Sequence, residues 1–128
     1  MNNSEFAEYF KKRTKQIALR AIKLCKKLFK TEEGRIIGRQ FLKSSTSVAA
    51  NYRAVCRARS GAEFFSKLSI VVEEADESAF WLEIILESGM AKEIGEEQET
   101  ENMLKEANEI LAVASSARKT VRTNKGNE

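Results

Sequence analysis

Two carboxylates at a helical spacing, Glu74 and Glu77, are the residues of this chain that could most directly do chemistry. Residues three apart on a helix project from the same face, where a pair of carboxylates can hold a metal ion or move a proton. The chain has no His, however, and helical di-metal sites draw ligands from Glu-x-x-His motifs. We therefore interpret the two Glu as partners of cationic or polar side chains, and we predict neither a metal nor a cofactor.

The hydroxyl groups of the chain give little support for nucleophilic catalysis. Ser44, Ser45, Thr46 and Ser47 form a dense run, but without His a Ser nucleophile would need a Lys as its base. Lys43 stands directly before Ser44, and adjacent residues of a helix point to different sides. The sequence also has no Gly-rich phosphate loop. We predict that the protein is not an enzyme.

The two cysteines, Cys25 and Cys56, fall inside expected helices and form no Cys-x-x-Cys motif. A zinc site would need further ligands such as His, which the chain lacks. We interpret both cysteines as small buried hydrophobic residues rather than as a disulfide.

Composition predicts that all of these residues stand on helices. The chain has no Pro and six Gly, and most of its residues are good helix formers. Apolar residues recur every three or four positions, with Phe6 and Phe10 in the first stripe, and predict helices over residues 4–29, 35–59, 62–87 and 97–120. Short connections between such helices are typical of an all-α, up-and-down four-helix bundle. We assign the bundle to residues 1–121 and a flexible tail to residues 122–128; three helices with one bent element are the alternative.

Two stripes of polar side chains run along the second and third of these helices. Their members are Gln40, Ser44, Ser47 and Asn51 on residues 35–59, and Glu74, Glu77 and Trp81 on residues 62–87. Ser60 and Glu63 have the Ser-x-x-Glu spacing of a capping box, which marks an abrupt helix start. The two helices must then fold back on each other. We predict that the stripes form a structural polar cluster or a subunit interface.

Charge is distributed unevenly along the chain, whose net charge is +3. Residues 1–60 hold fifteen Lys and Arg against four Glu, a net charge of +11, whereas residues 61–128 hold seven against fifteen acids, a net charge of −8. Basic helices could pack beside acidic ones, or the basic half could bind an anionic partner such as RNA. The candidate nucleic-acid-binding residues are Lys11, Lys12, Lys15, Arg20, Lys23, Lys26, Lys27, Arg53, Arg57 and Arg59.

The sequence shows no sign of a membrane segment. Residues 1–15 lack the apolar run of a signal peptide. No apolar stretch approaches the roughly 18 residues needed to span a bilayer. We expect a cytoplasmic protein that makes no contact with a membrane.

A set of residues between 40 and 85 follows a distinctive spacing of Ser, Asn, Glu and Trp. Its members are Gln40, Ser44, Ser47, Val48, Ala50 and Asn51, then Arg57, Arg59, Ser60, Phe64, Leu68, Glu74, Glu77, Ser78, Phe80, Trp81 and Leu82. This pattern resembles the four-helix bundle family also known as the 23S rRNA intervening-sequence proteins. The chain departs from the pattern at Lys43, where the family has Arg, and at Ala54, where the family has Glu.

The resemblance implies a left-handed up-and-down bundle that assembles into a homo-oligomeric ring, commonly a pentamer, with no established enzymatic activity. Some members are encoded within insertions of the large ribosomal RNA gene. A distant relative, the accessory variability protein of diversity-generating retroelements, pairs with a reverse transcriptase and binds nucleic acid through a basic surface. We therefore expect a non-enzymatic homo-oligomer that presents basic residues to RNA or to an RNA-bound protein. The alternative is a protein–protein scaffold or adaptor that binds no nucleic acid.

Overall fold

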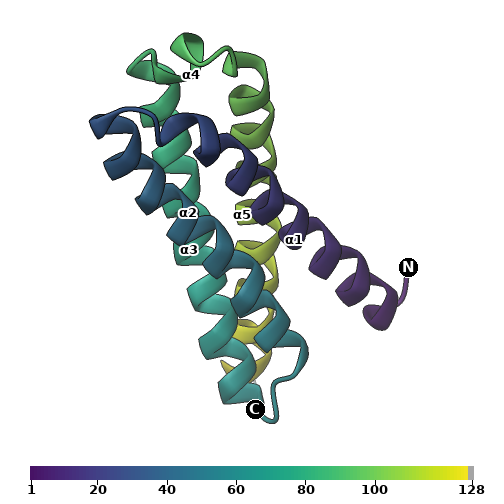
Figure 1. Cartoon of the computed structure of the whole chain (residues 1–128). Coiled ribbons are helices and arrows are strands. Elements are labelled where there is room, and N and C mark those ends of the chain that lie inside the picture. The colour runs from purple at the N-terminus through teal and green to yellow at the C-terminus, as the bar shows by residue number, and fades with distance from the viewer. Residues whose placement is uncertain (127–128) are drawn as a thin grey trace.

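The computed structural model describes residues 1–126, and all the regular elements among them are helices. Their bounds are Asn3–Leu28 for α1, Glu32–Cys56 for α2, Gly61–Glu87 for α3, Met90–Glu93 for α4 and Glu97–Gly126 for α5. The four long helices alternate in direction and form an up-and-down bundle (Figure 1). α1 and α3 each pack against α2 and α5, so they occupy diagonal corners. The predicted all-α bundle is confirmed, and the three-helix alternative is wrong.

A side-chain cap sets where α2 begins. Oγ1 of Thr31 accepts a hydrogen bond from the amide of Gly34 at 3.0 Å, which satisfies a donor that the first helical turn leaves unpaired. α2 therefore begins at Glu32, three residues before the predicted start. It also ends three residues earlier than predicted, at Cys56, because residues 57–60 have to reverse the chain before α3.

The start of α3 follows the predicted capping box in part. Oγ of Ser60 accepts a hydrogen bond from the amide of Glu63 at 3.1 Å, as predicted. The Glu63 carboxylate, which a complete box would turn towards Ser60, lies 3.8 Å from Nε of Arg59. The cap therefore depends on the hydroxyl of Ser60, and the carboxylate of Glu63 pairs with Arg59.

The connection between α3 and α5 contains a short helix that the sequence did not predict. Gly89 follows α3 with a φ of 87°, the left-handed conformation expected of a glycine that ends a helix. α4 occupies part of the segment that we expected to be a loop. α5 begins at Glu97, as predicted, and continues to Gly126, beyond the expected start of the tail. Residues 127–128 of that tail lie outside the described residues.

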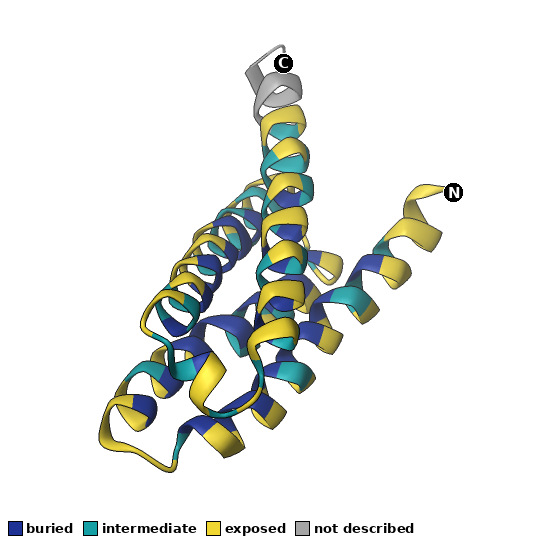
Figure 2. Ribbon diagram, turned by 90° about the horizontal axis from the view of Figure 1, so that it is seen from above, coloured by how far each residue is buried: buried dark blue, intermediate teal, exposed yellow. Residues whose placement is uncertain are grey.

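The core lies where the four long helices meet (Figure 2). Its largest fully buried side chains include Phe10 of α1, Phe41 of α2, Leu82 of α3, and Met103 and Ile110 of α5. Burying a side chain of this size contributes about 1.5–3 kcal/mol. Every long helix thus supplies part of the apolar surface that stabilises the bundle.

The first turns of α1 diverge from the rest of the bundle (Figures 1 and 2). Phe6, which the apolar pattern placed in the buried stripe, is 38% exposed. Its ring stacks on that of Phe10 with 5.6 Å between centroids. A groove of about 430 Å³ opens between this turn and residues such as Val113 and Ala117 of α5. The prediction that Phe6 is buried is wrong because α1 leaves α5 at this end.

α1 and α2 approach closely just after the turn that joins them. A Cβ at Gly34 would lie 1.8 Å from the carbonyl oxygen of Leu28, and one at Gly38 would lie 2.8 Å from the ring of Phe29. The carbonyl oxygen of Gly38 also accepts a hydrogen bond from Sγ of Cys25 at 3.4 Å. Glycine at position 34 lets the start of α2 approach the backbone of Leu28, and glycine at position 38 leaves room for the ring of Phe29.

Candidate nucleic-acid interface

One member of the predicted polar stripes, Ser44, lies at the contact between α2 and α3. The hydroxyl of Ser78 donates to that of Ser44 at 2.9 Å, and Ser44 donates to the carbonyl of Phe41 at 3.1 Å. Both Ser side chains are buried, and an unpaired buried hydroxyl would carry a desolvation penalty. The relay therefore satisfies both hydroxyls and joins the two helices. Sequence reasoning noted Ser78 only within the family pattern and not as a member of the stripe.

Four other members of the stripes form hydrogen bonds within their own helices. Nδ2 of Asn51 donates to the carbonyl and the hydroxyl of Ser47, at 2.9 and 3.0 Å. Nε1 of Trp81 donates to Glu77 at 3.2 Å. Gln40 is exposed on the surface of α2. The structure thus supports a local polar cluster along each helix, with the Ser44–Ser78 bond as the link between them.

The fold changes the titration of Glu74. Partial burial raises its pKa above the ordinary value of 4.5, and Glu77 raises it further, while Lys43 of α2 acts in the opposite direction. Across residues 1–126, no three His, Cys, Asp or Glu are arranged to hold a metal ion. Glu74 therefore provides a partly buried carboxyl group close enough to Lys43 for the two to interact.

The two thiols lie in different environments. Cys25 is buried, and burial raises its pKa to about 12. Cys56 is exposed at the last position of α2, so the prediction that both cysteines are buried is wrong for Cys56. The reason is that α2 ends there, and the chain turns away from the core. Both thiols are free, as predicted.

A row of cations at seven-residue intervals on α1 faces acidic side chains of α5 and of Glu96, the residue just before it. The pairs are Arg13 with Glu106 and Glu109, Arg20 with Glu99, and Lys27 with Glu96. The two Arg each present two nitrogens to one carboxylate, at 2.6 to 2.9 Å. These bonds hold the pKa values of Glu106 and Glu99 below 4.5. Arg20 and Lys27, which are candidates for nucleic-acid binding, thus form ion pairs within the molecule.

Cations on another side of α1 line a groove that α1 shares with α2. The groove has a volume of about 570 Å³, and its cationic residues are Lys11, Lys12, Lys15, Arg53 and Arg57. Thr46, Ala49 and Ala50 contribute short side chains to its wall. The sequence analysis did not assign these three residues to nucleic-acid binding, although they share a helical face with Arg53 and Arg57.

The groove is strongly positive because few of its charges are neutralised. Glu8 is the one carboxylate among the described residues that line it, and Glu8 pairs with Lys11 at 2.8 Å. Within the described part of the chain, Lys12, Lys15, Arg53 and Arg57 have no ion-pair partner. Half of the ten candidate nucleic-acid-binding residues are therefore brought together on one surface.

The remaining candidates lie elsewhere. Lys23 lines another groove, of about 400 Å³, beside Glu96 and beside Glu99 of α5. Lys26 is exposed in the last turn of α1, and Arg59 lies beside Glu63 between α2 and α3. These three residues do not extend the positive groove.

The family model described as 23S rRNA-intervening sequence protein matches residues 9–116. The chain belongs to this family. A similar solved structure is a protein of unknown function from the S23 ribosomal protein family of Bacteroides thetaiotaomicron VPI-5482. That protein is 28% identical, with a TM-score of 0.78, over 88% of this chain and 97% of its own. No curated protein matches the chain.

In this 23S rRNA-intervening sequence protein, the matched residues include every cation of the groove. The resemblance seen over residues 40–85 is confirmed and extends through most of the bundle. Of the two departures from the family pattern, Lys43 is close enough to Glu74 to affect its pKa, and Ala54 is half-buried on α2.

No helix within residues 1–126 combines the length and apolar character needed to cross a membrane.

Proposed function

We propose that this protein is a non-enzymatic, cytoplasmic homo-oligomer that binds RNA, and that the groove between α1 and α2 receives the phosphate backbone. The observation that supports this function is the charge of the groove. Five cations line it, and four of them have no ion-pair partner among the described residues. Cations arranged in this way bind phosphates and displace the counterions around them.

The side chains of the groove suit phosphates better than bases. Its described lining residues include no aromatic side chain, and the space between the cations is lined by Thr46, Ala49 and Ala50. Recognition of an unpaired base requires an aromatic face for stacking or polar groups placed against the base edge. Binding through this groove should therefore depend on charge and backbone shape rather than on base sequence.

A homo-oligomer would multiply the positive surface. In the pentamer-like ring that the resemblance implies, each subunit would present one groove to RNA or to an RNA-bound protein. Two grooves that hold the same RNA increase the apparent affinity, because binding at the second groove becomes intramolecular. Modest binding by one subunit would then become strong binding by the ring.

Charge reversal in the groove tests this function. Lys12→Glu combined with Arg53→Glu changes two exposed cations that line the groove. We expect the affinity for an RNA of mixed sequence to fall more than about tenfold, and the slope of log affinity against log salt to become shallower by about 1.5. Fluorescence anisotropy over a salt series measures both quantities.

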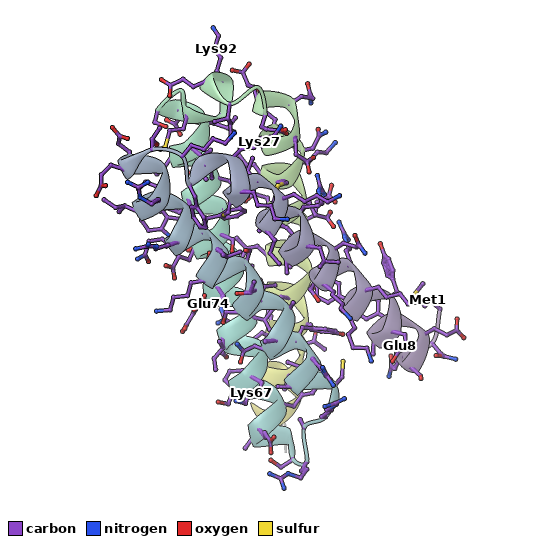
Figure 3. All side chains as sticks on the ribbon, in the orientation of Figure 1. Met1, Glu8, Lys27, Lys67, Glu74 and Lys92 are labelled. Carbon is purple, nitrogen blue, oxygen red and sulfur yellow. The ribbon has the colours of Figure 1, made fainter. Side chains whose placement is uncertain are left out.

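A matched control changes the same amount of charge elsewhere. Lys92→Glu combined with Lys105→Glu alters two exposed Lys on α4 and α5. Figure 3 shows Lys92 at the α4 end of the molecule, far from Glu8 at the edge of the groove. We expect this control to retain most of the affinity. Equal losses in the two double variants, or an affinity that ignores salt, would contradict binding through the groove.

A protein–protein scaffold or adaptor is the second candidate function. Phe80 favours it, because its ring is 49% exposed and meets Trp81 edge-on with 4.9 Å between centroids. Exposed aromatic residues are common anchors of protein interfaces. Partners that remain bound after nuclease treatment would favour the adaptor, whereas partners lost on treatment with ribonuclease would favour RNA binding.

A further inference from the structure

Two exposed helix faces of opposite charge have the same spacing of residues. The basic stripe consists of Lys15, Leu19, Ile22 and Lys26 on α1, and the acidic stripe consists of Asp76, Phe80, Glu83 and Glu87 on α3. Both sets advance by four, three and four residues, as one continuous face of a helix does. The two stripes therefore have matching length and opposite charge.

Each stripe places exposed apolar side chains between charged residues. Leu19 and Ile22 are 46% and 41% exposed, and Phe80 is 49% exposed. Across residues 1–126, the charged members of both stripes have no ion-pair partner. This contrasts with the α5-facing side of α1, where Arg13 and Arg20 are held by carboxylates. Both stripes thus carry exposed apolar side chains, and their charged side chains have no ion-pair partner among the described residues.

We propose that the acidic stripe of one copy of this chain binds the basic stripe of a second copy. The inference rests on the self-assembly in the proposed function, and it adds which surfaces meet. In either relative direction of the two helices, each Lys would oppose a carboxylate, and Phe80 would oppose Leu19 or Ile22. Burial of these apolar groups favours association, and the surrounding charges specify partner and register.

The arrangement of the bundle prevents one copy from pairing its own stripes. α1 and α3 occupy diagonal corners, so their exposed faces point away from each other. A contact between two different faces is heterologous, repeats head to tail, and closes into a ring when the rotation between copies permits. Lys11, Lys12, Arg53 and Arg57 lie outside the basic stripe, so the groove remains available to RNA; Lys15 lies at the edge of both surfaces.

Two complementary variants test this contact. Phe80→Ser removes the apolar centre of the acidic stripe, and Leu19→Ser with Ile22→Ser removes that of the basic stripe. Light scattering measures the mass of each variant at concentrations where the wild type is an oligomer. Each variant alone should have the monomer mass of 14.5 kDa. Mixed together, the variants retain one intact pair of stripes. The mixture should therefore form a dimer of twice 14.5 kDa and nothing larger.

Controls separate a lost contact from a lost fold. Circular dichroism checks that each variant remains helical, and Lys26→Glu, which alters only a charge, should weaken assembly in the same direction. Ile36→Ser changes a side chain that is 54% exposed on α2, outside both stripes, and should keep the wild-type mass.

The outcomes distinguish this contact from the wider proposal. If the stripe variants keep the wild-type mass, or if their mixture stays monomeric, the contact between stripes is wrong and self-assembly through another surface stands. A wild-type protein that is monomeric at every concentration overturns both the contact and the homo-oligomer, while RNA affinity is measured independently at the groove.

Discussion

At Gly34, the absence of a side chain decides how the first two helices meet. The residue lies in the first turn of α2, where its amide donates to the cap residue Thr31. Its Cα faces the carbonyl of Leu28 so closely that an added Cβ would lie 1.8 Å from the oxygen. One residue thus serves both the start of α2 and its close approach to the end of α1.

Gly34→Ala is expected to destabilise the protein by about 1–3 kcal/mol, because the new methyl group would force the two backbones apart. Urea denaturation measures the difference. Gly61→Ala is the control, since a Cβ there meets nothing within 4 Å, and loss of backbone freedom in the unfolded chain should leave stability unchanged or raised by up to about 1 kcal/mol. Wild-type stability in Gly34→Ala would contradict the tight approach.

At the scale of elements, ion pairs join α1 to α5 where apolar contact is limited. The cations of α1 follow one side of the helix. The carboxylates of α5, and Glu96 just before it, meet them in reverse order, as two antiparallel helices require. These side chains are partly exposed, so each pair contributes at most about 1 kcal/mol. Their value lies in specifying the register of two helices that diverge towards the first turn of α1.

These ion pairs predict a loss of stability in acid. Glu106 and Glu99 have pKa values below 4.5 in the folded protein, so the unfolded chain binds their protons more readily. Their stabilisation is present above the ordinary pKa of the unfolded chain and is lost as the pH falls through the lower, folded pKa. Glu74 acts in the opposite sense, because its pKa is raised and its protonation favours the folded state.

Arg13→Gln combined with Arg20→Gln should lower stability near neutral pH and make the decline on acidification shallower. Urea midpoints measured from about pH 7 to about pH 3 test this difference. Lys30→Gln is a suitable control, because Lys30 is exposed just beyond the end of the same helix and is free of ion pairs within the described residues. Parallel curves for the double variant and the wild type would show that the pairs contribute nothing.

At the scale of the whole molecule, packing leaves two kinds of charge exposed on different sides. The carboxylates of Glu96, Glu99 and Glu106 neutralise the cations on one side of α1. The groove between α1 and α2 and the basic stripe remain positive. The acidic stripe of α3 remains negative on the diagonal corner. The small net charge of +3 therefore conceals surfaces suited to two different partners, a polyanion and another copy of the chain.

The proposed assembly of copies of this chain should respond to salt. At low ionic strength we expect a mass of five times 14.5 kDa, the pentamer that the family resemblance implies. Near 1 M salt the Debye length falls to about 3 Å, so the charges of the stripes should attract each other less and the average mass should decrease. Light scattering at the two ionic strengths tests this expectation, and a mass of 14.5 kDa at both would contradict it.

Local patterns predicted the features that depend on one helix at a time. The periodic apolar residues placed Phe10 in the core, and Ser60 of the predicted capping box lies where α3 begins. The same logic failed at Phe6, because its burial depends on whether α5 accompanies α1 to its first turn. It also missed α4, because a helix of so few residues is too short to show a helical period.

The sequence by itself determined the helices, the family and the excess of cations in the first half of the chain, because period, caps and composition are local properties. Only the tertiary structure decided which cations remain available. Arg20 and Lys12 stand on the same helix with the same type of charge, yet Arg20 meets a carboxylate of α5 and Lys12 lines the positive groove. Coulomb attraction acts between side chains that the fold brings together, and that proximity arises only when the helices pack.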